Sequence, residues 1–270
     1  MNSTIRACVF DLGGTIVDRY SFSPFFSLKR AFMKNNIKIS DRVILKDMGM
    51  SKNEHIGRIL SDKYVEKNWF LKYGKFPEPN DTDMIYEDFK IEQNKLSKVI
   101  NILPETKSTF EYLKERNVKI GITTGFDKEN MDLILSRMED EGLYVDGAVS
   151  STCLLRSRPY PDMINKLKDD FNIENNYQIV KFDDTPIGIK EAKNGGFWSV
   201  GVVKWSTLME IVEPEDVMGV GLMASDEYNK RLMNARKTLI DSEADFVIHD
   251  LTEINNVFKE VHRSILYDYF

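Results

Sequence analysis

Cysteine and long apolar runs are both scarce in this sequence of 270 residues. Its two cysteines, Cys8 and Cys153, are too few for a disulfide framework, and Cys8 lies in an apolar run where a small buried side chain is expected. No apolar run approaches the roughly 18 residues that span a bilayer, and the first residues, MNSTIRACVF, lack the apolar core of a signal peptide. We therefore expect a soluble, cytoplasmic protein with no membrane partner.

An excess of basic charge is also absent. The chain has 37 lysines and arginines against 43 aspartates and glutamates, a net charge of −6. Because nucleic-acid-binding proteins usually present a basic face, we expect no nucleic-acid partner, although a local basic pocket for a small anion remains compatible with this balance. The length suffices for one large α/β domain, or for a core with a smaller module.

Short apolar segments rich in valine and isoleucine alternate with segments of helical periodicity. This alternation is typical of buried parallel strands joined by crossover helices, so it predicts an α/β fold with an open, doubly wound parallel sheet. The expected strands are 7–10, 118–123, 146–150, 177–182, 198–203 and 245–249, and the expected helices include 105–116, 128–141, 161–171 and 186–194.

Residues 21–99 interrupt the alternation, because they contain helical patterns and no convincing strand. We expect an inserted α-helical cap domain here, over the C-terminal end of the first strand, with PEPN (77–80) as a loop within it. The core domain then comprises residues 1–20 and 100–270. Within the core, 205–243 has further helical patterns without recognisable chemistry, and it is expected to cover the core or a subunit interface.

The first expected strand runs into the segment VFDLGGTIVD, residues 9–18. Asp11 stands at the strand end, and Gly13 and Gly14 leave backbone N–H groups exposed in the next turn. Such a turn can bind phosphate oxygens, and a carboxylate beside it can serve as a nucleophile. Taken alone, Asp11 could instead cap a following helix.

Two other segments offer groups for a phosphate. GITTGF (121–126) ends a strand on Thr124 and Gly125, where a hydroxyl and a closely approaching N–H suit a phosphate oxygen. RSRPYP (156–161) contains Arg158, whose guanidinium could stabilise both a phosphate and a carboxylate nucleophile. Either segment alone is a weak signal, because such threonines and arginines are common in turns and on surfaces.

A fourth segment, IVKFDDTPIGIKEA (179–192), places Asp183 and Asp184 at another strand end. Asp184 together with Asp11 fits a Mg²⁺ site, with Asp183 as an additional candidate ligand. Taken alone, Asp184 could equally be the N-cap of the next helix. Ligands of doubly wound sheets bind at the carboxyl ends of the strands, so we expect the four segments to meet there.

The order and spacing of these segments resemble the haloacid dehalogenase-like (HAD-like) superfamily, which has a Rossmannoid core. The resemblance implies that Asp11 is the nucleophile and a Mg²⁺ ligand, with the backbone carbonyl of Gly13 as a further ligand. It also implies that Thr124 binds phosphate, Arg158 stabilises charge and Asp184 holds the metal. Most members carry a second Asp two residues after the nucleophile as proton donor, and this chain has Gly13 there.

The cap segment MGMSKNEH (48–55), together with TTGF, RPYP and DDT…IKEAKNGGFWSVGV, resembles the phosphonoacetaldehyde hydrolase family, a capped branch of that superfamily. The resemblance implies that Lys52 forms a Schiff base with an aldehyde substrate, with His55 as its acid/base or positioning partner. Met48 and Gly49 would border the same pocket, and the protein would be a homodimer. By spacing alone, Lys52 and His55 share one helical face, where a lysine is usually solvated and a histidine usually packed.

This chemistry would explain Gly13. Hydrolysis of a C–P bond leaves a carbanion unless an iminium on Lys52 accepts the electrons as an enamine. Asp11 can then attack phosphorus, and no acid is needed for an alkoxide leaving group. We expect Mg²⁺-dependent conversion of phosphonoacetaldehyde to acetaldehyde and phosphate.

Two positions depart from the family pattern. Gly188 replaces a second acidic-motif Asp, which should weaken Mg²⁺ binding unless Asp183 compensates, and Phe126 replaces an expected Tyr. Two alternatives therefore stay open. One is a capped phosphatase or phosphotransferase for a small phosphate ester, whose turnover would survive Lys52→Ala. The other is a catalytically weakened homologue that binds an anion tightly without Mg²⁺-dependent turnover.

Overall fold

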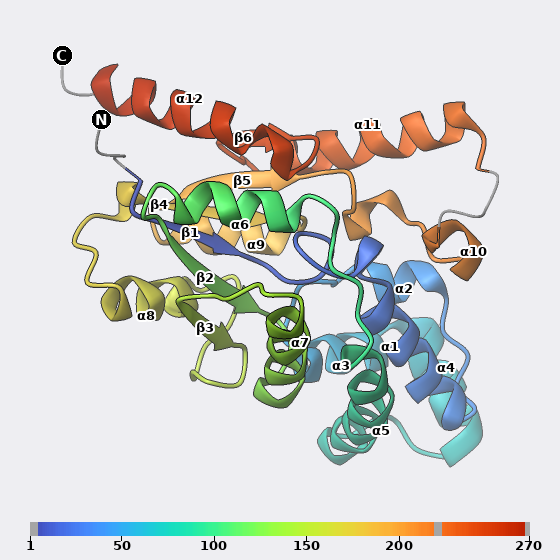
Figure 1. The fold of residues 1–270 in the computed structure, drawn as a ribbon. Coiled ribbons are helices and arrows are strands. Elements are labelled where there is room, and N and C mark those ends of the chain that lie inside the picture. The colour runs from blue at the N-terminus through green and yellow to red at the C-terminus, as the bar shows by residue number, and fades with distance from the viewer. Residues whose placement is uncertain (1–4, 219–222, 268–270) are drawn as a thin grey trace.

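The computed structural model describes residues 5–218 and 223–267 of the chain (Figure 1). Within these residues, parallel strands form one sheet in the order β3-β2-β1-β4-β5-β6. The doubly wound α/β fold is confirmed, and each strand lies within two residues of its predicted range. The strands are β1 (Ala7–Phe10), β2 (Lys119–Thr124), β3 (Gly147–Ser150), β4 (Ile179–Asp183), β5 (Trp198–Val202) and β6 (Phe246–Ile248).

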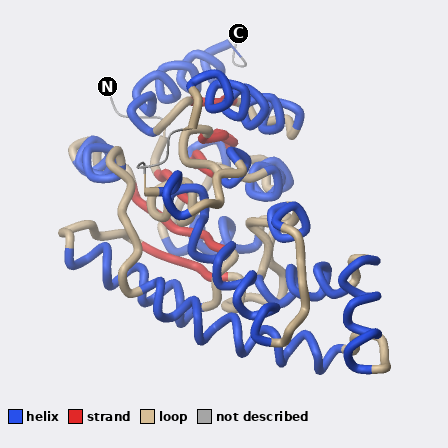
Figure 2. The backbone as a smooth tube through the Cα atoms, turned by 90° about the vertical axis from the view of Figure 1, so that its right-hand side faces the viewer, coloured by secondary structure: helices blue, strands red, loops and turns tan. Residues whose placement is uncertain are grey.

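Side chains of β1 alternate between the two faces of the sheet, as the two-residue period of a strand requires. Cys8 and Phe10 belong to one apolar cluster, and Ala7 and Val9 belong to another. Helices cover both faces, so the strands lie buried between them (Figure 2). The first face is covered by α6 (Thr106–Lys114), α7 (Lys128–Asp140) and α12 (Ile254–Tyr267), and the second by α8 (Asp162–Asp170), α9 (Pro186–Asn194) and α11 (Ser225–Asp241).

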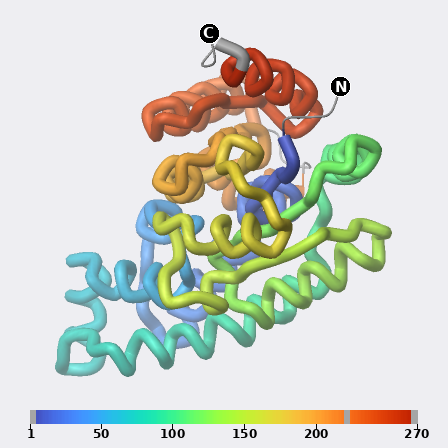
Figure 3. The backbone as a smooth tube through the Cα atoms, turned by 90° about the vertical axis from the view of Figure 1, so that its left-hand side faces the viewer, coloured from blue at the N-terminus to red at the C-terminus, as the bar shows by residue number. Residues whose placement is uncertain are grey.

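Residues 21–99 form helices, as predicted, and lie at the carboxyl end of the sheet, in the blue to teal part of Figure 3. These helices share their own apolar cluster, which includes Phe25, Ile56 and Trp69. Domain boundaries at 20/21 and 99/100 remain a prediction. The helices are α1 (Phe22–Lys34), α2 (Asp41–Leu45), α3 (Lys52–Leu60), α4 (Lys63–Tyr73) and α5 (Pro79–Ser97).

The predicted loop at 77–80 is wrong in its second half. Gly74, in a left-handed conformation, ends α4, and α5 already begins at Pro79. Proline is well suited to the first turn of a helix, because an N–H there would have no partner within the helix. The loop therefore ends at Glu78, whose side chain and backbone form a capping box with Asp81.

The region 205–243 contains α10 (Pro214–Val217) and α11, whereas residues 219–222 lie outside the described part. Leu239 of α11 packs with Ile189, Val203 and Met209, so this region covers the core. None of the helices in the described ranges combines the length and apolar character needed to cross a membrane.

Candidate active site

The predicted segments meet at the carboxyl edge of the sheet, beneath the helical insertion, around a cavity of about 20 Å³. Arg158, Asp183, Gly14 and His55 are not among its lining residues, although all four were predicted as site residues. Sequence reasoning had not assigned a role to Ser21, Pro24, Phe126 or Thr185, which do line it. The complete lining is Asp11, Gly13, Ser21, Pro24, Met48, Gly49, Lys52, Thr124, Gly125, Phe126, Asp184 and Thr185.

Asp11 directly follows β1, and its N–H donates to Phe182 O at 3.0 Å, which continues the sheet by one residue. Its carboxylate pairs with the buried Arg158, with Nη2 2.8 Å from Oδ1. Burial raises the pKa of Asp11, and the charge of Arg158 opposes that shift. Asp11 therefore serves as the partner of a buried cation, and the helix-cap alternative is wrong because the next helical residues start only at Arg19.

Arg158 is itself held by groups that sequence reasoning missed. Its Nε lies 2.9 Å from Glu191 Oε2, and its Nη2 donates to Thr123 O at 2.6 Å. Lys181, buried in β4, donates to Thr123 Oγ1 at 2.8 Å and pairs with Asp183 at 3.1 Å. Burial alone would lower the pKa of Arg158, but the surrounding carboxylates outweigh it and raise that pKa. A signal was present, because a lysine inside the buried run IVKF must have a partner.

Asp11, Asp183 and Asp184 offer carboxylate oxygens that lie within 4.8 Å of one another. Oδ2 of Asp184 accepts from Thr207 N at 2.8 Å, whereas Oδ1 is buried and has no hydrogen-bond partner in the described part of the chain. Burial, together with the charges of Asp11 and Asp183, raises the pKa of Asp184 well above its usual value. Such an all-oxygen group with an uncommitted ligand atom fits a hard divalent cation such as Mg²⁺.

Gly14 permits this approach of the first turn to Asp184. Its φ is +73°, and a Cβ there would lie only 2.5 Å from Asp184 Oδ2. Any side chain at this position would displace the carboxylate, so the glycine is required by both conformation and space.

Gly188 is also a glycine for lack of space, so it need not represent the loss of a carboxylate from the site. A Cβ at Gly188 would lie 1.9 Å from Asp183 Cγ, so the Asp183 carboxylate already fills the space that a side chain at 188 would need. Thr185 donates to Asp183 Oδ1 from N at 3.0 Å and from Oγ1 at 2.7 Å. Thr185 also caps α9 by accepting from Gly188 N, so the alternative that Asp184 is the N-cap is wrong.

Lys52 begins α3 and is 5% exposed, so the interpretation as a solvated surface lysine is wrong. Its Nζ lies 3.5 Å from Met50 O and 5.8 Å from the centre of the Phe126 ring. Burial lowers the pKa of Lys52 to about 8; Asp11 opposes this shift and Arg158 adds to it. A substantial neutral fraction near pH 7 follows, as a nucleophilic amine requires.

His55 is fully buried one turn further along α3. Its Nε2 lies 2.9 Å from Ile44 O, and because a carbonyl only accepts, Nε2 carries the hydrogen. Nδ1 is buried and has no hydrogen-bond partner among the described residues. Burial, and then the charge of Lys52, hold the pKa of His55 well below its usual value, so the ring is neutral.

Two glycines bring the insertion onto the core. A Cβ at Gly125 would lie 2.5 Å from Met50 O, and a Cβ at Gly49, whose φ is +92°, would lie 2.7 Å from Thr185 Oγ1. Arg158 Nη1 also donates to Gly49 O at 3.4 Å. The 48–50 loop therefore packs tightly on the core, against the backbone of Gly125 and the side chains of Thr185 and Arg158.

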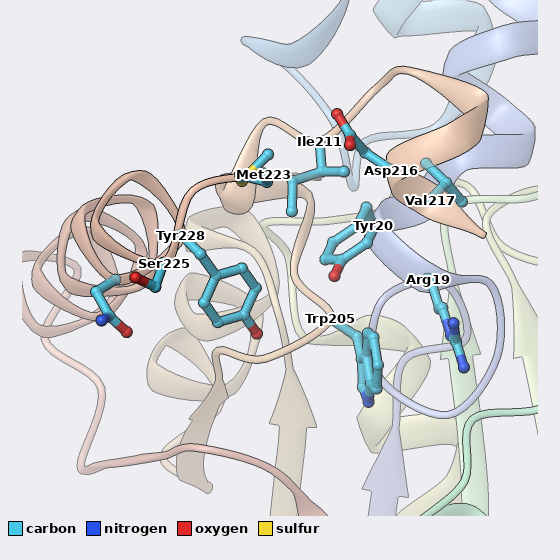
Figure 4. Close-up of a pocket in the computed structure, with 10 residues that line it drawn as sticks. Arg19, Tyr20, Trp205, Ile211, Asp216, Val217, Met223, Ser225 and Tyr228 are labelled. Carbon is cyan, nitrogen blue, oxygen red and sulfur yellow. The ribbon is translucent and has the colours of Figure 1, made fainter. Parts of the chain in front are cut away.

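A second, wider cavity of about 420 Å³ lies beside Tyr20, at the start of the insertion (Figure 4). Trp205 and Tyr228 form part of its wall, and Arg19 stacks on Trp205 with its guanidinium carbon 4.6 Å from the ring centre. None of the catalytic candidates lines this cavity. The cavity affects the site only indirectly, because its wall includes Tyr20 and Trp205, whose contact fixes the backbone just before Ser21.

A family model described as "Haloacid dehalogenase-like hydrolase" matches residues 8–202. The chain belongs to this family. Among curated relatives of this HAD-like hydrolase, the phosphonoacetaldehyde hydrolase of Bacillus mycoides is 30% identical over 269 residues, covering 97% of this chain and 98% of that protein. The phosphonoacetaldehyde hydrolase of Latilactobacillus sakei is 30% identical over 251 residues, covering 93% of each. The predicted family resemblance is confirmed.

Solved structures agree with this assignment of the HAD-like hydrolase. A phosphonoacetaldehyde hydrolase-like protein from Oleispira antarctica superimposes with a TM-score of 0.91 at 26% identity, covering 97% of this chain and 94% of that one. A β-phosphoglucomutase from Clostridium difficile, with a TM-score of 0.65 at 17% identity, shares the fold alone.

Proposed function

We propose that this HAD-like hydrolase cleaves the C–P bond of phosphonoacetaldehyde, giving acetaldehyde and phosphate. The observation that carries the proposal is a buried amine, Lys52, that lines the same small cavity as the carboxylate of Asp11. A simple phosphate ester offers no carbonyl for a neutral amine to attack, whereas an aldehyde substrate condenses with one. The names of the curated relatives support the same substrate.

In the first step, neutral Lys52 attacks the aldehyde carbonyl and, with loss of one water, forms an iminium. Its pKa of about 8 supports this role. His55 is neutral, and its Nδ1, unpaired within the described residues, is the candidate acceptor for the proton that leaves the amine. Phe126 borders the amine with an apolar ring.

In the second step, an oxygen of Asp11 attacks phosphorus as the C–P bond breaks. The bonding electrons enter the iminium and produce an enamine on Lys52, and the phosphoryl group becomes an aspartyl-phosphate. Arg158 remains paired with Asp11 and offsets charge on the phosphoryl oxygens. One water then hydrolyses the aspartyl-phosphate, and after protonation of the enamine a second water releases acetaldehyde. The net reaction consumes one water.

Asp11, Asp184 and the carbonyl of Gly13, with Asp183 as an additional ligand, would hold Mg²⁺. When bound, Mg²⁺ offsets the negative charge of the phosphoryl oxygens. The unpartnered Oδ1 of Asp184 and the mutual proximity of the three carboxylates support this assignment.

The remaining lining groups bind the phosphonate and enclose the aldehyde. The Thr124 hydroxyl and the N–H groups of Gly13 and Gly125, which line the cavity, are the proposed phosphate ligands, because N–H groups in turns favour anions. The N–H of Gly14, expected to bind phosphate as well, instead donates to Val17 O and Asp18 O at 2.9 Å. Met48 and Gly49 close the cavity from the insertion.

The proposal is tested by measuring acetaldehyde and phosphate released from phosphonoacetaldehyde, with and without Mg²⁺. We expect equal amounts of both products in the presence of Mg²⁺, and loss of both in Lys52→Arg and in Asp11→Asn. A panel of phosphate esters is the comparison. Ester turnover that survives Lys52→Ala, without phosphonate turnover in the wild type, would instead identify an ester phosphatase.

We also propose that the protein is a cytoplasmic homodimer. Both cysteines are free thiols, which suits a reducing compartment. Exposed apolar side chains on and after α4, namely Phe70, Leu71 and Phe76, offer a surface for a second copy. Sedimentation analysis that shows a monomer at micromolar concentration would exclude the dimer.

A further inference from the structure

Ser21 presents an uncommitted hydroxyl to the catalytic cavity. It is 6% exposed and lines the cavity together with Asp11 and Lys52. Its N–H donates to Asp18 O, but within the described residues its Oγ makes no hydrogen bond. A polar group that is nearly buried and unpaired by protein is available for a ligand in the cavity.

The position of this hydroxyl is unusual with respect to the nucleophile. A Cβ at Gly13 would lie 2.9 Å from Ser21 Oγ and 3.5 Å from its Cβ. Ser21 therefore occupies the space that a side chain two residues after Asp11 would need, on the cavity side of the turn. The Ser21 hydroxyl can therefore occupy this position only because residue 13 has no side chain.

The conformation that places Ser21 there is held from both sides. Ser21 has a φ of +50°, and Asp18 and Tyr20 before it have φ values of +55° and +60°, which residues other than glycine rarely adopt. Tyr20 N donates to Trp205 O at 2.7 Å, and the centroids of their rings are 5.7 Å apart. Figure 4 shows both side chains in the wall of the wider cavity. The Asp18 carboxylate accepts from Ser23 N at 3.0 Å and from Ser23 Oγ at 2.6 Å.

Strained turns that are held by several partners are common at functional sites, and here the unpaired Ser21 hydroxyl lines the same cavity as Asp11. We propose that Ser21 is a substrate-binding residue whose hydroxyl donates to a non-bridging oxygen of the phosphoryl group. This inference rests on the proposed function only for the identity of the substrate. A neutral donor suits a carbon leaving group, because the phosphoryl oxygens need stabilisation while no departing oxygen needs a proton.

The first experiment measures binding of inorganic phosphate to the Mg²⁺-loaded protein by calorimetry. Ser21→Gly removes the hydroxyl and suits the positive φ, and Ser21→Ala removes the same hydroxyl while keeping Cβ. We expect phosphate to bind about 5- to 10-fold more weakly to both variants, the usual effect of one lost hydrogen bond. Affinity equal to that of the wild type in both variants would overturn the inference.

Acetaldehyde trapping on Lys52 by borohydride serves as the internal control, because it does not involve a phosphoryl group. Its rate should not change in Ser21→Gly, and a parallel loss of trapping would mean that the substitution has disturbed the whole cavity and would reject a specific phosphoryl contact. Since phosphate binding needs no turnover, failure of C–P cleavage would reject the proposed function without altering this result.

A second pair of variants tests the shared space directly. Gly13→Asp introduces a side chain that meets Ser21 Oγ, so we expect a lower melting temperature than the wild type. In Gly13→Asp/Ser21→Gly this overlap is removed, so the decrease in melting temperature relative to the wild type should be at most half of that in Gly13→Asp. A double variant no more stable than Gly13→Asp would contradict the placement of the hydroxyl above Gly13.

Discussion

Lys52 combines a buried position with two neighbouring carboxylates and one cation. Burial lowers its pKa, Asp11 raises it, and the outcome is about 8. A lysine with that pKa is neutral in about a tenth of the molecules at pH 7, against less than about a thousandth for an unperturbed one. The larger fraction of neutral amine is therefore due mainly to burial of the Lys52 side chain, and Arg158 adds to the effect.

The pH dependence of the reaction should report this titration. The protonated amine cannot attack the aldehyde, so kcat/KM for phosphonoacetaldehyde should rise with pH and level off above about 8. Steady-state kinetics between pH 6 and 9.5, with Mg²⁺ saturating throughout, measure the profile. A flat profile across this range would contradict an amine that titrates near 8.

The Asp183 carboxylate occupies the space that a side chain at position 188 would need, so a carboxylate could be supplied from either position. Gly188→Asp should destabilise the protein by about 1–3 kcal/mol, because its Cβ meets the Asp183 carboxylate. Asp183→Gly/Gly188→Asp should recover most of that loss and bind Mg²⁺ more tightly than Asp183→Gly alone. Chemical denaturation and calorimetric Mg²⁺ titration measure both effects. Recovery of neither quantity would show that the two positions do not share one carboxylate site.

Among the secondary-structure elements, the loop before α3 packs closely on the loop after β2, with backbone atoms in contact. Gly125 lies against Met50 O, and Arg158 reaches Gly49 O from the core side. Contacts of this kind leave no space for a side chain, so they determine how closely the helical insertion can approach the nucleophile.

Gly125→Ala should therefore reduce kcat/KM about 100-fold or more, because a 1 Å displacement of the 48–50 loop moves Lys52 relative to Asp11. Gly57→Ala in α3 is the matched control, since a Cβ there meets nothing within 4 Å. In that helix, alanine should raise stability by about 0.5–1 kcal/mol and leave activity unchanged. Equal values of kcat/KM for the two variants would show that the contact between Gly125 and the 48–50 loop does not position Lys52.

The elements and several site residues could be predicted because they depend on local patterns. Strands such as β1 and β4 are largely apolar runs that lead directly into aspartates, and the parallel sheet brings their ends together. Contacts set by tertiary structure could not be predicted in the same way. Nothing in the residue type of Ser21 signals a positive φ, and the overlap of Asp183 with position 188 depends on the turn between them. The start of α5 at Pro79 was likewise hidden by a loop-like composition.

For the whole molecule, the buried charges at the sheet edge do not balance. Asp11, Asp183 and Glu191 are paired with the buried cations Arg158 and Lys181, whereas Asp184 makes no ion pair among the described residues. Uncompensated charge of this kind destabilises the folded state unless a cation binds or a carboxylate takes up a proton. The raised pKa of Asp184 is the consequence in the metal-free protein.

Stability should therefore depend on Mg²⁺, and the effect should pass through Asp184. At a Mg²⁺ concentration of 100 times Kd, we expect about 2.7 kcal/mol of added stability in the wild type. Asp184→Asn should lose most of this gain, yet without metal it should be at least as stable as the wild type, since one repulsive charge is gone. Thermal unfolding with EDTA or Mg²⁺ compares the two proteins. Asp184→Asn that is strongly destabilised in EDTA would contradict the charge argument.

The central claim is that Lys52 forms a Schiff base with the substrate while Asp11 attacks phosphorus. Its most direct test is borohydride addition during turnover of phosphonoacetaldehyde, followed by peptide mass spectrometry. We predict a reduced two-carbon adduct on Lys52, together with loss of activity that matches the modified fraction. Full turnover in borohydride with no adduct on Lys52 would contradict the account.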